Sequence, residues 1–411
     1  MPSNLTDIEQ ARALVLECAA PLEHELVLLD EALGRTLARD IWSPGPIPHF
    51  DSSAMDGFAL RCEDVRDASE QAPVSLELIG ESRAGHPLAH TLGPSQAAVI
   101  STGAMVPAGA DAVIALERAA THAGRVQINQ AVRAGNDIRL AGEDIAAGTL
   151  VLRAGRNLDP AALGIAASLG HAELACTRRP RVSVITTGDE LLEPGQPPRP
   201  ASIFNSNGRT IPALTRQVGA STGAHVSVGD DAQATREAIA SALAECDVTV
   251  ICGGVSVGAH DHVRPTLAEL GVHEHFWGIA LKPGKPTWFG TRDGRLVFGL
   301  PGNPVSAMVT FILLVAPSLR ALLGASPVRH TAHAALACDY RKPAGRAHAL
   351  RCQLHADSDG LSAAPSGSQG SHVLSSMLDA DALAIIPAAC EHLAAGERVE
   401  LELLDGQVAL A

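Results

Sequence analysis

The chain has 411 residues, 46% of them hydrophobic and 18% charged, with a formal net charge of −14. This length predicts two to four domains with ample core, and the acidic balance argues against general nucleic-acid binding. We count no apolar run of membrane-spanning length, and the eight scattered cysteines, which lack CxxC spacing, favour a reduced cytoplasmic protein over one held together by disulfides.

The first 45 residues predict one helix followed by extended chain. Apolar residues at helical spacing occupy positions 4–20, and extended segments follow at 26–29 and 33–41. Three prolines, Pro44, Pro46 and Pro48, then interrupt the pattern. We expect a domain boundary there.

The next hundred residues predict a small, mainly-β domain. Short apolar segments at 74–79, 97–102 and 112–116 alternate with Gly- and Pro-rich loops. The turn 50–59 contains Asp51, Asp56 and two serines, although such residues often only bond the backbone of their own turn. A hydroxyl at Thr102 beside Gly103, and a charged loop at Gly142-Glu143-Asp144, are further site candidates or plain solvated turns.

Residues 158–170 predict a helix, and from Arg181 strand and helix patterns alternate. This alternation predicts a mostly parallel α/β sheet with helices on both faces. Ligands of such sheets bind at the carboxyl ends of the strands, so the turns there should converge on one crevice. The turns supply carboxylates suited to a phosphate ester with a hard divalent cation: Asp189, Glu190, Asp230, Asp231 and Asp261.

The segment 248–261 is the most informative one. Its β-branched run 248–252 predicts a strand buried on both faces, and Gly253, Gly254 and Ser256 follow before a helix near His262. Residues without Cβ let backbone N–H groups approach an anion, which favours a phosphate cradle. The pattern matches neither a Walker A nor a dinucleotide motif, so an ordinary turn stays open.

The chain contains three lysines, and two of them, Lys282 and Lys285, lie in one proline-stiffened loop. We interpret them as anion clamps, with a rigid connection carrying solvated lysines as the alternative. The turn 299–304, which includes Pro301 and Asn303, precedes an apolar helix at 305–323 and has a helix-entry turn as its alternative.

The last 80 or so residues predict a separate β domain. Short alternating or apolar runs occupy 330–339, 348–355, 361–364, 382–387 and 399–404. The loop 367–372 is a plain flexible turn by its composition alone.

Taken together, these segments resemble one family, the molybdopterin molybdenumtransferases, which includes bacterial MoeA and the E domain of gephyrin. The resemblance extends over essentially the whole chain in eight motifs that occur in the family's order. They are FDSSAMDGFA at 50–59, STGAMVPAGADAV at 101–113, GED at 142–144, TTGDEL at 186–191, GGVSVG at 253–258, KPGKP at 282–286, GLPGNPVSA at 299–307 and GSQGSH at 367–372.

The resemblance implies a homodimer of four-domain subunits that binds adenylylated molybdopterin and molybdate, inserts molybdenum and releases AMP with Mg²⁺. The domains would be a discontinuous linking domain at 1–45 and 146–178, a mainly-β domain at 46–145, a central α/β molybdopterin-binding domain at 179–327 and a C-terminal β domain at 328–411. Small molecules would be its ligands, with other cofactor-biosynthesis proteins and acceptor molybdoenzymes as possible partners, and with no nucleic acid or membrane.

Matching motif positions carry the family's site residues onto this chain. The catalytic set is Asp56, Thr102, Asp144, Glu190, Asp231, Asp261, Lys282 and Lys285. Within it Glu190, Asp231 and Asp261 would hold Mg²⁺. The substrate-binding set is Gly253, Gly254, Ser256, Pro301, Asn303, Arg346, Arg351 and Ser371, in which Arg346, Arg351 and Ser371 are the weaker matches. The resemblance also implies that the mainly-β domain of one subunit faces the α/β crevice of the other.

Two departures from the family pattern stand out. Where the family has GVSVGExDY, this chain reads GVSVGAHDH, so Ala259, His260 and His262 surround Asp261 and a carboxylate and a phenol are missing. Ser52 stands where an asparagine is common. The first change puts metal affinity and turnover in doubt.

Three other functions stay open from sequence. The α/β domain alone also resembles the molybdopterin adenylyltransferases, which carry out the preceding AMP transfer, although the other motif sets argue against that activity. A non-catalytic scaffold could reuse the fold and bind a partner peptide. An NTP-hydrolysing enzyme is weaker, because the Walker A lysine is lacking.

Overall fold

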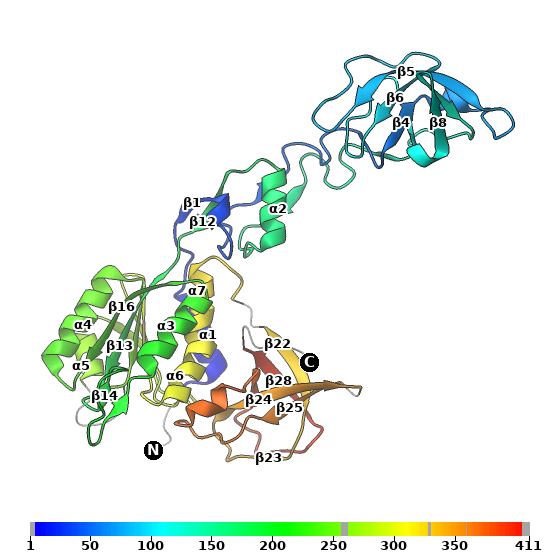
Figure 1. The fold of residues 1–411 in the computed structure, drawn as a ribbon. Helices are drawn as coiled ribbons and strands as arrows, with labels where there is room; N and C mark the ends of the chain where they lie inside the picture. Colours follow the sequence, from blue (N-terminus) through cyan, green and yellow to red (C-terminus); the bar gives the residue numbers. More distant parts are fainter. Residues whose placement is uncertain (1–4, 256–261, 328–329, 359, 405–411) are drawn as a thin grey trace. The chain divides into compact units, whose positions relative to one another are not determined.

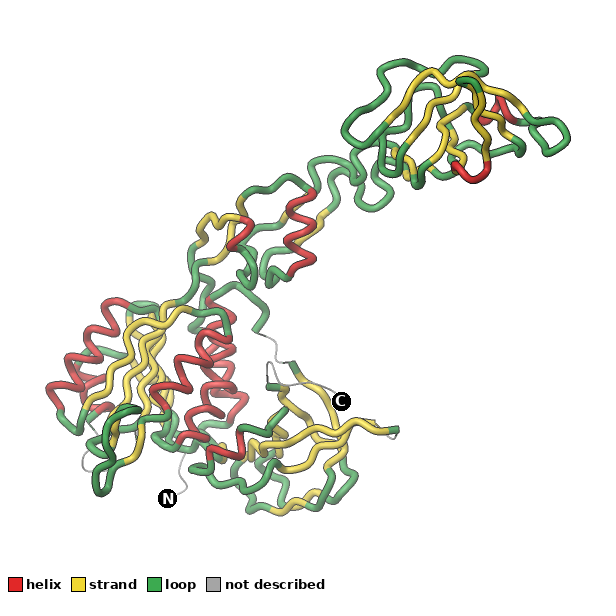
Figure 2. The backbone as a smooth tube through the Cα atoms, in the orientation of Figure 1, coloured by secondary structure: helices red, strands yellow, loops and turns green. Residues whose placement is uncertain are grey.

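The computed structural model describes residues 5–255, 262–327, 330–358 and 360–404. The chain divides into two compact units, one made of residues 1–39, 154–159 and 173–411, and the other of 40–153 and 160–172. Figure 2 traces both along the backbone. The finer division into four domains stays a prediction.

The unit of residues 40–153 and 160–172 is built on a six-stranded sheet in the order β7-β4-β6-β5-β9-β8, with only β5 and β6 parallel (Figure 1). Phe58, Leu76 and Val126 are buried in its core. The expected mainly-β fold of this region is confirmed. The sheet strands are β4 (Gly57–Leu60), β5 (Val74–Ser82), β6 (Gln96–Ile100), β7 (Ala112–Ala115), β8 (Ala119–His122) and β9 (Arg125–Ile128).

Short elements complete this unit. Two antiparallel pairs join segments distant in sequence, and the helix α2 (Pro160–Ser168) lies within the predicted range 158–170. The pairs are β3 (Ser52–Ser53) with β10 (Ile138–Arg139), and β2 (Ile41–Trp42) with β11 (Leu150–Leu152).

The larger unit contains a second six-stranded sheet, in the order β16-β13-β17-β21-β20-β18. All strands but β20 run in the same direction, because the pairings β21–β20 and β20–β18 are antiparallel and the other three are parallel. The prediction of a mostly parallel sheet is confirmed. The strands are β13 (Arg181–Thr187), β16 (Ser221–Val228), β17 (Val248–Cys252), β18 (His273–Trp277), β20 (Trp288–Arg292) and β21 (Arg295–Leu300). Two separate two-stranded sheets belong to the same unit: the antiparallel pair β1 (His24–Leu28) and β12 (Glu173–Thr177), and the parallel pair β14 (Leu191–Leu192) and β15 (Ile203–Phe204).

Helices cover both faces of this sheet because β17 is apolar on both sides. Val250 belongs to the core cluster that contains Ile211 of α3 (Asn207–Gln217), whereas Ile251 packs with Ile239 of α4 (Ala232–Glu245). Figure 1 shows α4 and α5 (Val263–Glu269) on one face and α3 on the other. The helix α1 (Ile8–Glu17) buries Ile8 in the same cluster as α3.

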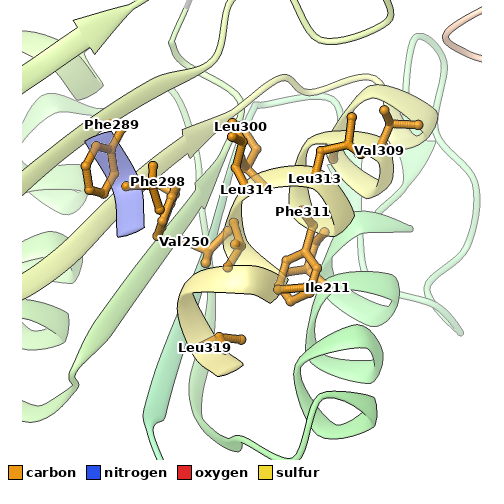
Figure 3. Packing of buried hydrophobic residues seen from close by; sticks show 14 of the residues in the cluster. Ile211, Val250, Phe289, Phe298, Leu300, Val309, Phe311, Leu313, Leu314 and Leu319 are labelled. Carbon is orange, nitrogen blue, oxygen red and sulfur yellow. The ribbon is translucent and has the colours of Figure 1, made fainter. Parts of the chain in front are cut away.

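A long apolar helix fills the centre of this core. It consists of α6 (Pro304–Thr310), the π-helical turn η4 (Phe311–Val315) and α7 (Ala316–Leu322). Figure 3 shows Leu314 near Leu300 of β21 and Phe311 near Ile211 of α3, all within one core cluster. Our count of no membrane-length run is wrong for this segment, because its 19 residues have a mean hydropathy of 1.9. Since 78% of it is buried inside the fold, core packing accounts for that hydropathy.

The C-terminal strands close into a small barrel, because β24 pairs with both β25 and β26 and the remaining strands complete the circuit through β22 and β28. The expected β domain is confirmed. Its strands are β22 (Thr331–Leu336), β24 (Ala347–Asp357), β25 (Gly360–Pro365), β26 (Ala382–Ile386) and β28 (Arg398–Leu403), with the pair β23 (Tyr340–Arg341) and β27 (His392–Leu393) beside them. The strand β19 (Leu281–Lys282) extends this sheet through parallel pairing with β24.

All eight cysteines are free in this structure.

Candidate functional site

The expected crevice forms where the parallel strands β13, β17 and β21 end. Gly253, directly after β17, donates its N–H to the carbonyl of Leu300 at the end of β21, and Gly188 after β13 donates to Val228 at the end of β16. Parallel strands present their carboxyl ends at one edge, so turns separated by more than a hundred residues meet there.

The Gly253-Gly254 turn requires glycine at both positions. Gly253 has φ +98° and Gly254 has φ +63°, which L side chains rarely adopt. A Cβ on Gly253 would lie 2.8 Å from the Thr187 carbonyl oxygen, and one on Gly254 would lie 2.6 Å from Val263 Cγ2. The predicted cradle residue Ser256, together with Ala259, His260 and Asp261, lies outside the described residues.

A cavity of about 660 Å³ opens in front of this turn. Its wall includes Gly253, Gly254, Glu190, Pro301 and Asn303, all of which the sequence predicted as site residues. Cys252 also lines it, but burial raises the pKa of that thiol to about 12, so the group stays protonated at neutral pH.

Sequence reasoning missed Phe204 in this wall and gave its asparagines no role, although it expected the run Asn205-Ser206-Asn207 at this crevice. Phe204, Asn205 and Asn207 line the cavity, and Asn207 donates from Nδ2 to the Gly302 carbonyl at 2.7 Å. The structure confirms the expected position of the run Asn205-Ser206-Asn207, which opens α3 beside the strand ends where ligands of such sheets bind.

A second cavity of about 550 Å³ adjoins the first, because Pro286, Pro301, Asn303 and His372 line both. Its wall brings Lys282 and Lys285 together with Arg346 and Ser371, which come from the C-terminal barrel and its loop. The structure therefore unites most of the predicted anion-binding residues.

The charge of this second cavity is one-sided. Lys282, Lys285 and Arg346 contribute three positive charges, and within the described part of the chain its lining contains no carboxylate. None of the three cationic groups has a hydrogen-bond or ion-pair partner among the described residues. Burial, followed by the charges of Lys282, Lys342 and Arg346, lowers the pKa of the neighbouring His348 to about 4.

Arg351 occupies a different position from the one predicted. Its side chain is only 1% exposed and donates from Nε to Ser376 Oγ and from one terminal nitrogen to the carbonyls of Ser368 and Gly370. Gln369 exchanges hydrogen bonds with the Arg351 backbone. In this structure Arg351 therefore supports the 367–372 loop, and its role in substrate binding stays a prediction.

The loop that Arg351 supports reaches the site through two contacts. Asn303 Nδ2 donates to Ser371 Oγ at 3.1 Å, and Val305 N–H donates to the Ser371 carbonyl. The C-terminal barrel thus delivers Ser371 and His372 to the crevice of the α/β sheet.

The predicted metal ligands are only partly in view. Glu190 lines the 660 Å³ cavity, and its carboxylate has no hydrogen-bond or ion-pair partner among the described residues. Asp231 caps α4, with Oδ1 accepting from the Ala234 N–H at 2.7 Å. No group of three candidate metal ligands occurs among the described residues, and the third predicted ligand, Asp261, falls outside them.

In the mainly-β unit, the structure brings two predicted residues into contact. Asp56 Oδ1 accepts from the Thr102 N–H at 2.7 Å and from its hydroxyl at 3.1 Å. The loop that carries Asp144 joins the same turn, because Asp51 Oδ1 accepts from the Ala141 N–H at 2.8 Å. Asp56, Thr102 and Asp144 are all exposed, so this unit presents a polar surface with a hydroxyl and carboxylates.

Three family models match the chain in sequence order. The MoeA N-terminal region (domain I and II) matches residues 6–170, a probable molybdopterin binding domain matches 183–321, and the MoeA C-terminal region (domain IV) matches 333–404.

Individual relatives match along almost the full length. The molybdopterin molybdenumtransferase of Haemophilus influenzae is 36% identical over 401 residues, which is 96% of this chain and 98% of the relative. That of Bacillus subtilis is 34% identical, covering 93% of this chain and 90% of its own. The crystal structure of the molybdopterin biosynthesis MoeA protein from Pyrococcus horikosii, 34% identical, superposes with a TM-score of 0.86 over 98% of this chain and 100% of that chain.

Proposed function

Because this chain belongs to the molybdopterin molybdenumtransferase family and is therefore a transferase of molybdenum cofactor biosynthesis, we propose that it inserts molybdenum from molybdate into adenylylated molybdopterin. In the same site it hydrolyses the adenylate with Mg²⁺ and releases AMP. The two dithiolene sulfurs bind molybdenum as thiolates, and their two protons leave with one molybdate oxygen as water. A separate water molecule cleaves the phosphoanhydride bond, giving AMP and the phosphate of the molybdopterin.

The observation that carries this proposal is the cationic cavity beside the glycine turn. An acidic chain concentrates three unpaired cations on a wall without a carboxylate among its described residues. Such a site suits a compact oxyanion, because each ammonium or guanidinium adds a charge-assisted hydrogen bond to oxygen. The adjoining 660 Å³ cavity has room for the larger organic substrate.

The residues divide the work by their chemistry. Lys282, Lys285 and Arg346 neutralise molybdate or a phosphate group. The backbone N–H of Gly254 approaches phosphate or pterin oxygens, since no Cβ stands in the way. Gly253, whose N–H bonds the Leu300 carbonyl, leaves the wall beside it open to the substrate. Asn303 and Ser371 add neutral hydrogen-bonding groups between the two cavities, and Ser256 would extend the cradle.

Mg²⁺ would be held by Glu190, Asp231 and Asp261. Carboxylate oxygens are the ligands this hard cation prefers, and the unpartnered carboxylate of Glu190 on the cavity wall fits that role. The ion would supply charge neutralisation at the phosphoanhydride.

Asp56, Thr102 and Asp144 would position the molybdate-bearing end of the substrate. The proposal makes the protein a cytoplasmic homodimer in which the mainly-β unit of one subunit serves the α/β crevice of the other. Other cofactor-biosynthesis proteins and acceptor molybdoenzymes would deliver the substrate and take up the product.

The test is AMP release by the purified protein supplied with adenylylated molybdopterin, Mg²⁺ and molybdate. We expect release to require molybdate and to be lost in Asp261→Ala and Glu190→Gln. Glu245→Gln, an exposed carboxylate at the far end of α4, provides a control with the same loss of charge.

Two outcomes would contradict the proposal. Tight substrate binding without AMP release in any variant would favour a scaffold. Formation of adenylylated molybdopterin from ATP and molybdopterin, without molybdate-dependent release, would instead assign the preceding adenylyl transfer.

A further inference from the structure

Lys342, the third lysine of the chain, is buried in the C-terminal barrel unit with only 6% of its side chain exposed. Among the described residues it has no carboxylate partner. Its ammonium donates instead to three backbone carbonyls: Arg346 at 2.9 Å, Ala388 at 3.2 Å and Pro343 at 3.4 Å. A buried ammonium is costly unless hydrogen-bonded, so this arrangement fixes the carbonyls that surround it.

Two of the three acceptors, Pro343 and Arg346, lie in the turn that contains Lys342, and the third, Ala388, lies in the segment after β26. Residues 342–346 connect β23 to β24, and Gly345 in this turn has φ +96° and donates its N–H to the Ala388 carbonyl at 3.0 Å. Ala388 follows β26. Lys342 therefore joins the two ends of the turn to a fixed point on the barrel, and it donates to none of the barrel strands.

The residue that this turn delivers is Arg346. On its C-terminal side the backbone is held by β24, because the Ala347 N–H donates to the Ala280 carbonyl at 2.8 Å and Lys282 pairs with His348. On its N-terminal side the turn depends on Lys342, whose ammonium bonds the carbonyl of Arg346 itself.

The Arg346 side chain lines the cationic cavity with Lys282 and Lys285 and has no partner there among the described residues. A long side chain without partners loses rotamer entropy when it engages a ligand, and a fixed backbone reduces that loss. We infer that Lys342 is a positioning residue, which holds the backbone of Arg346 so that its guanidinium meets the tetrahedral oxyanion substrate together with Lys282 and Lys285. This inference rests on the proposed function of the cavity.

The ordinary alternative is that Lys342 only stabilises the barrel. The two readings differ in a double-mutant cycle with Arg346, because a positioning residue acts through the residue that it positions. Lys342→Met removes the ammonium with little change of side-chain volume, and Arg346→Ala removes the guanidinium.

The measurement is isothermal titration of the full-length protein with molybdate, using Lys342→Met, Arg346→Ala and the double variant. We expect Lys342→Met to weaken molybdate binding about 10-fold, the scale expected from a misplaced binding group. In the Arg346→Ala background the same substitution should change the affinity by less than about twofold. In the AMP-release assay Lys342→Met should raise the KM for molybdate more than it lowers kcat.

A second variant covers the case in which Lys342→Met does not fold. A Cβ on Gly345 would have no neighbour within 4 Å, so Gly345→Ala strains only the backbone of the turn at φ +96°. Gly345→Ala should weaken molybdate binding in the wild-type background and have little effect in the Arg346→Ala background. Asp339→Asn, which removes a charged acceptor for the Ala395 N–H in the same barrel unit, should lower the melting temperature without changing molybdate affinity.

The outcomes separate this inference from the function on which it rests. If Arg346→Ala weakens molybdate binding but Lys342→Met does not, the positioning role is refuted and the cavity stands. An equal effect of Lys342→Met with and without Arg346 also refutes it. If Arg346→Ala leaves molybdate affinity unchanged, the proposed anion cavity fails and the inference fails with it.

Discussion

Each lysine removed from the cationic cavity should reduce the free energy of oxyanion binding by a similar amount. At about 4 Å and an effective dielectric of about 20, a unit charge and a dianion attract by about 8 kcal/mol before desolvation. Lys282 and Lys285 are exposed, so solvent screening cuts this sharply. We therefore expect each lysine to contribute about 1.4 kcal/mol of binding free energy, or tenfold in affinity, as a hydrogen bond to a charged group does.

The assay is calorimetric titration with molybdate of the wild type, Lys282→Gln, Lys285→Gln and the double variant. We expect about 10-fold weaker binding for each single variant and about 100-fold for the double one. Wild-type affinity should fall between 0.1 M and 1 M salt, since the Debye length shrinks from about 10 Å to about 3 Å, and the double variant should be much less sensitive.

The matched control is Arg216→Gln. Arg216 is an exposed residue of α3 outside the cationic cavity, and its guanidinium has no hydrogen-bond or ion-pair partner among the described residues, yet its loss changes net charge by the same amount. If this variant weakens molybdate binding as much as Lys282→Gln does, the overall charge of the protein sets the affinity. In that case our reasoning from the local cavity is refuted.

Three further predictions concern stability and the crevice. Gly254→Ala should destabilise the protein by about 2 kcal/mol in urea unfolding and impair substrate binding, because its Cβ would lie 2.6 Å from Val263 Cγ2; unchanged stability would contradict the geometry. Arg12 and Glu402 form a buried ion pair at 2.7 Å. Arg12→Met alone should therefore lower the free energy of unfolding by about 3–5 kcal/mol, and adding Glu402→Met should recover much of that loss. An equal loss of stability in the single and double variants would refute this. Since the pKa of His348 is about 4 in the folded protein and about 6.5 when unfolded, the unfolded chain binds more protons between these values, and stability should fall by up to about 3 kcal/mol as pH drops from 6.5 to 4. His348→Gln should flatten that dependence, and an unchanged pH profile would contradict it.

The main helices and strands, and the edge of the sheet at which the site lies, could be predicted from local patterns in the sequence. The β-branched run 248–252 can be buried on both faces only in a central strand, and it became β17 at the middle of the sheet. The glycines after this strand and the lysines of the 282–286 loop predicted an anion-binding site, because both features depend only on residues close together in the sequence. A glycine pair sets backbone geometry, and two lysines set charge, within a few residues.

Which of these groups line the same cavity depends on how distant segments pair in the fold. Arg346 meets Lys282 because β19 pairs with β24 across more than sixty residues of chain. Arg351 and Lys342 look like Arg346 in the sequence, yet both are buried and bond backbone carbonyls. A cationic residue becomes a ligand group or a structural one according to the desolvation and the acceptors that distant strands place around it, and no local pattern in the sequence records either.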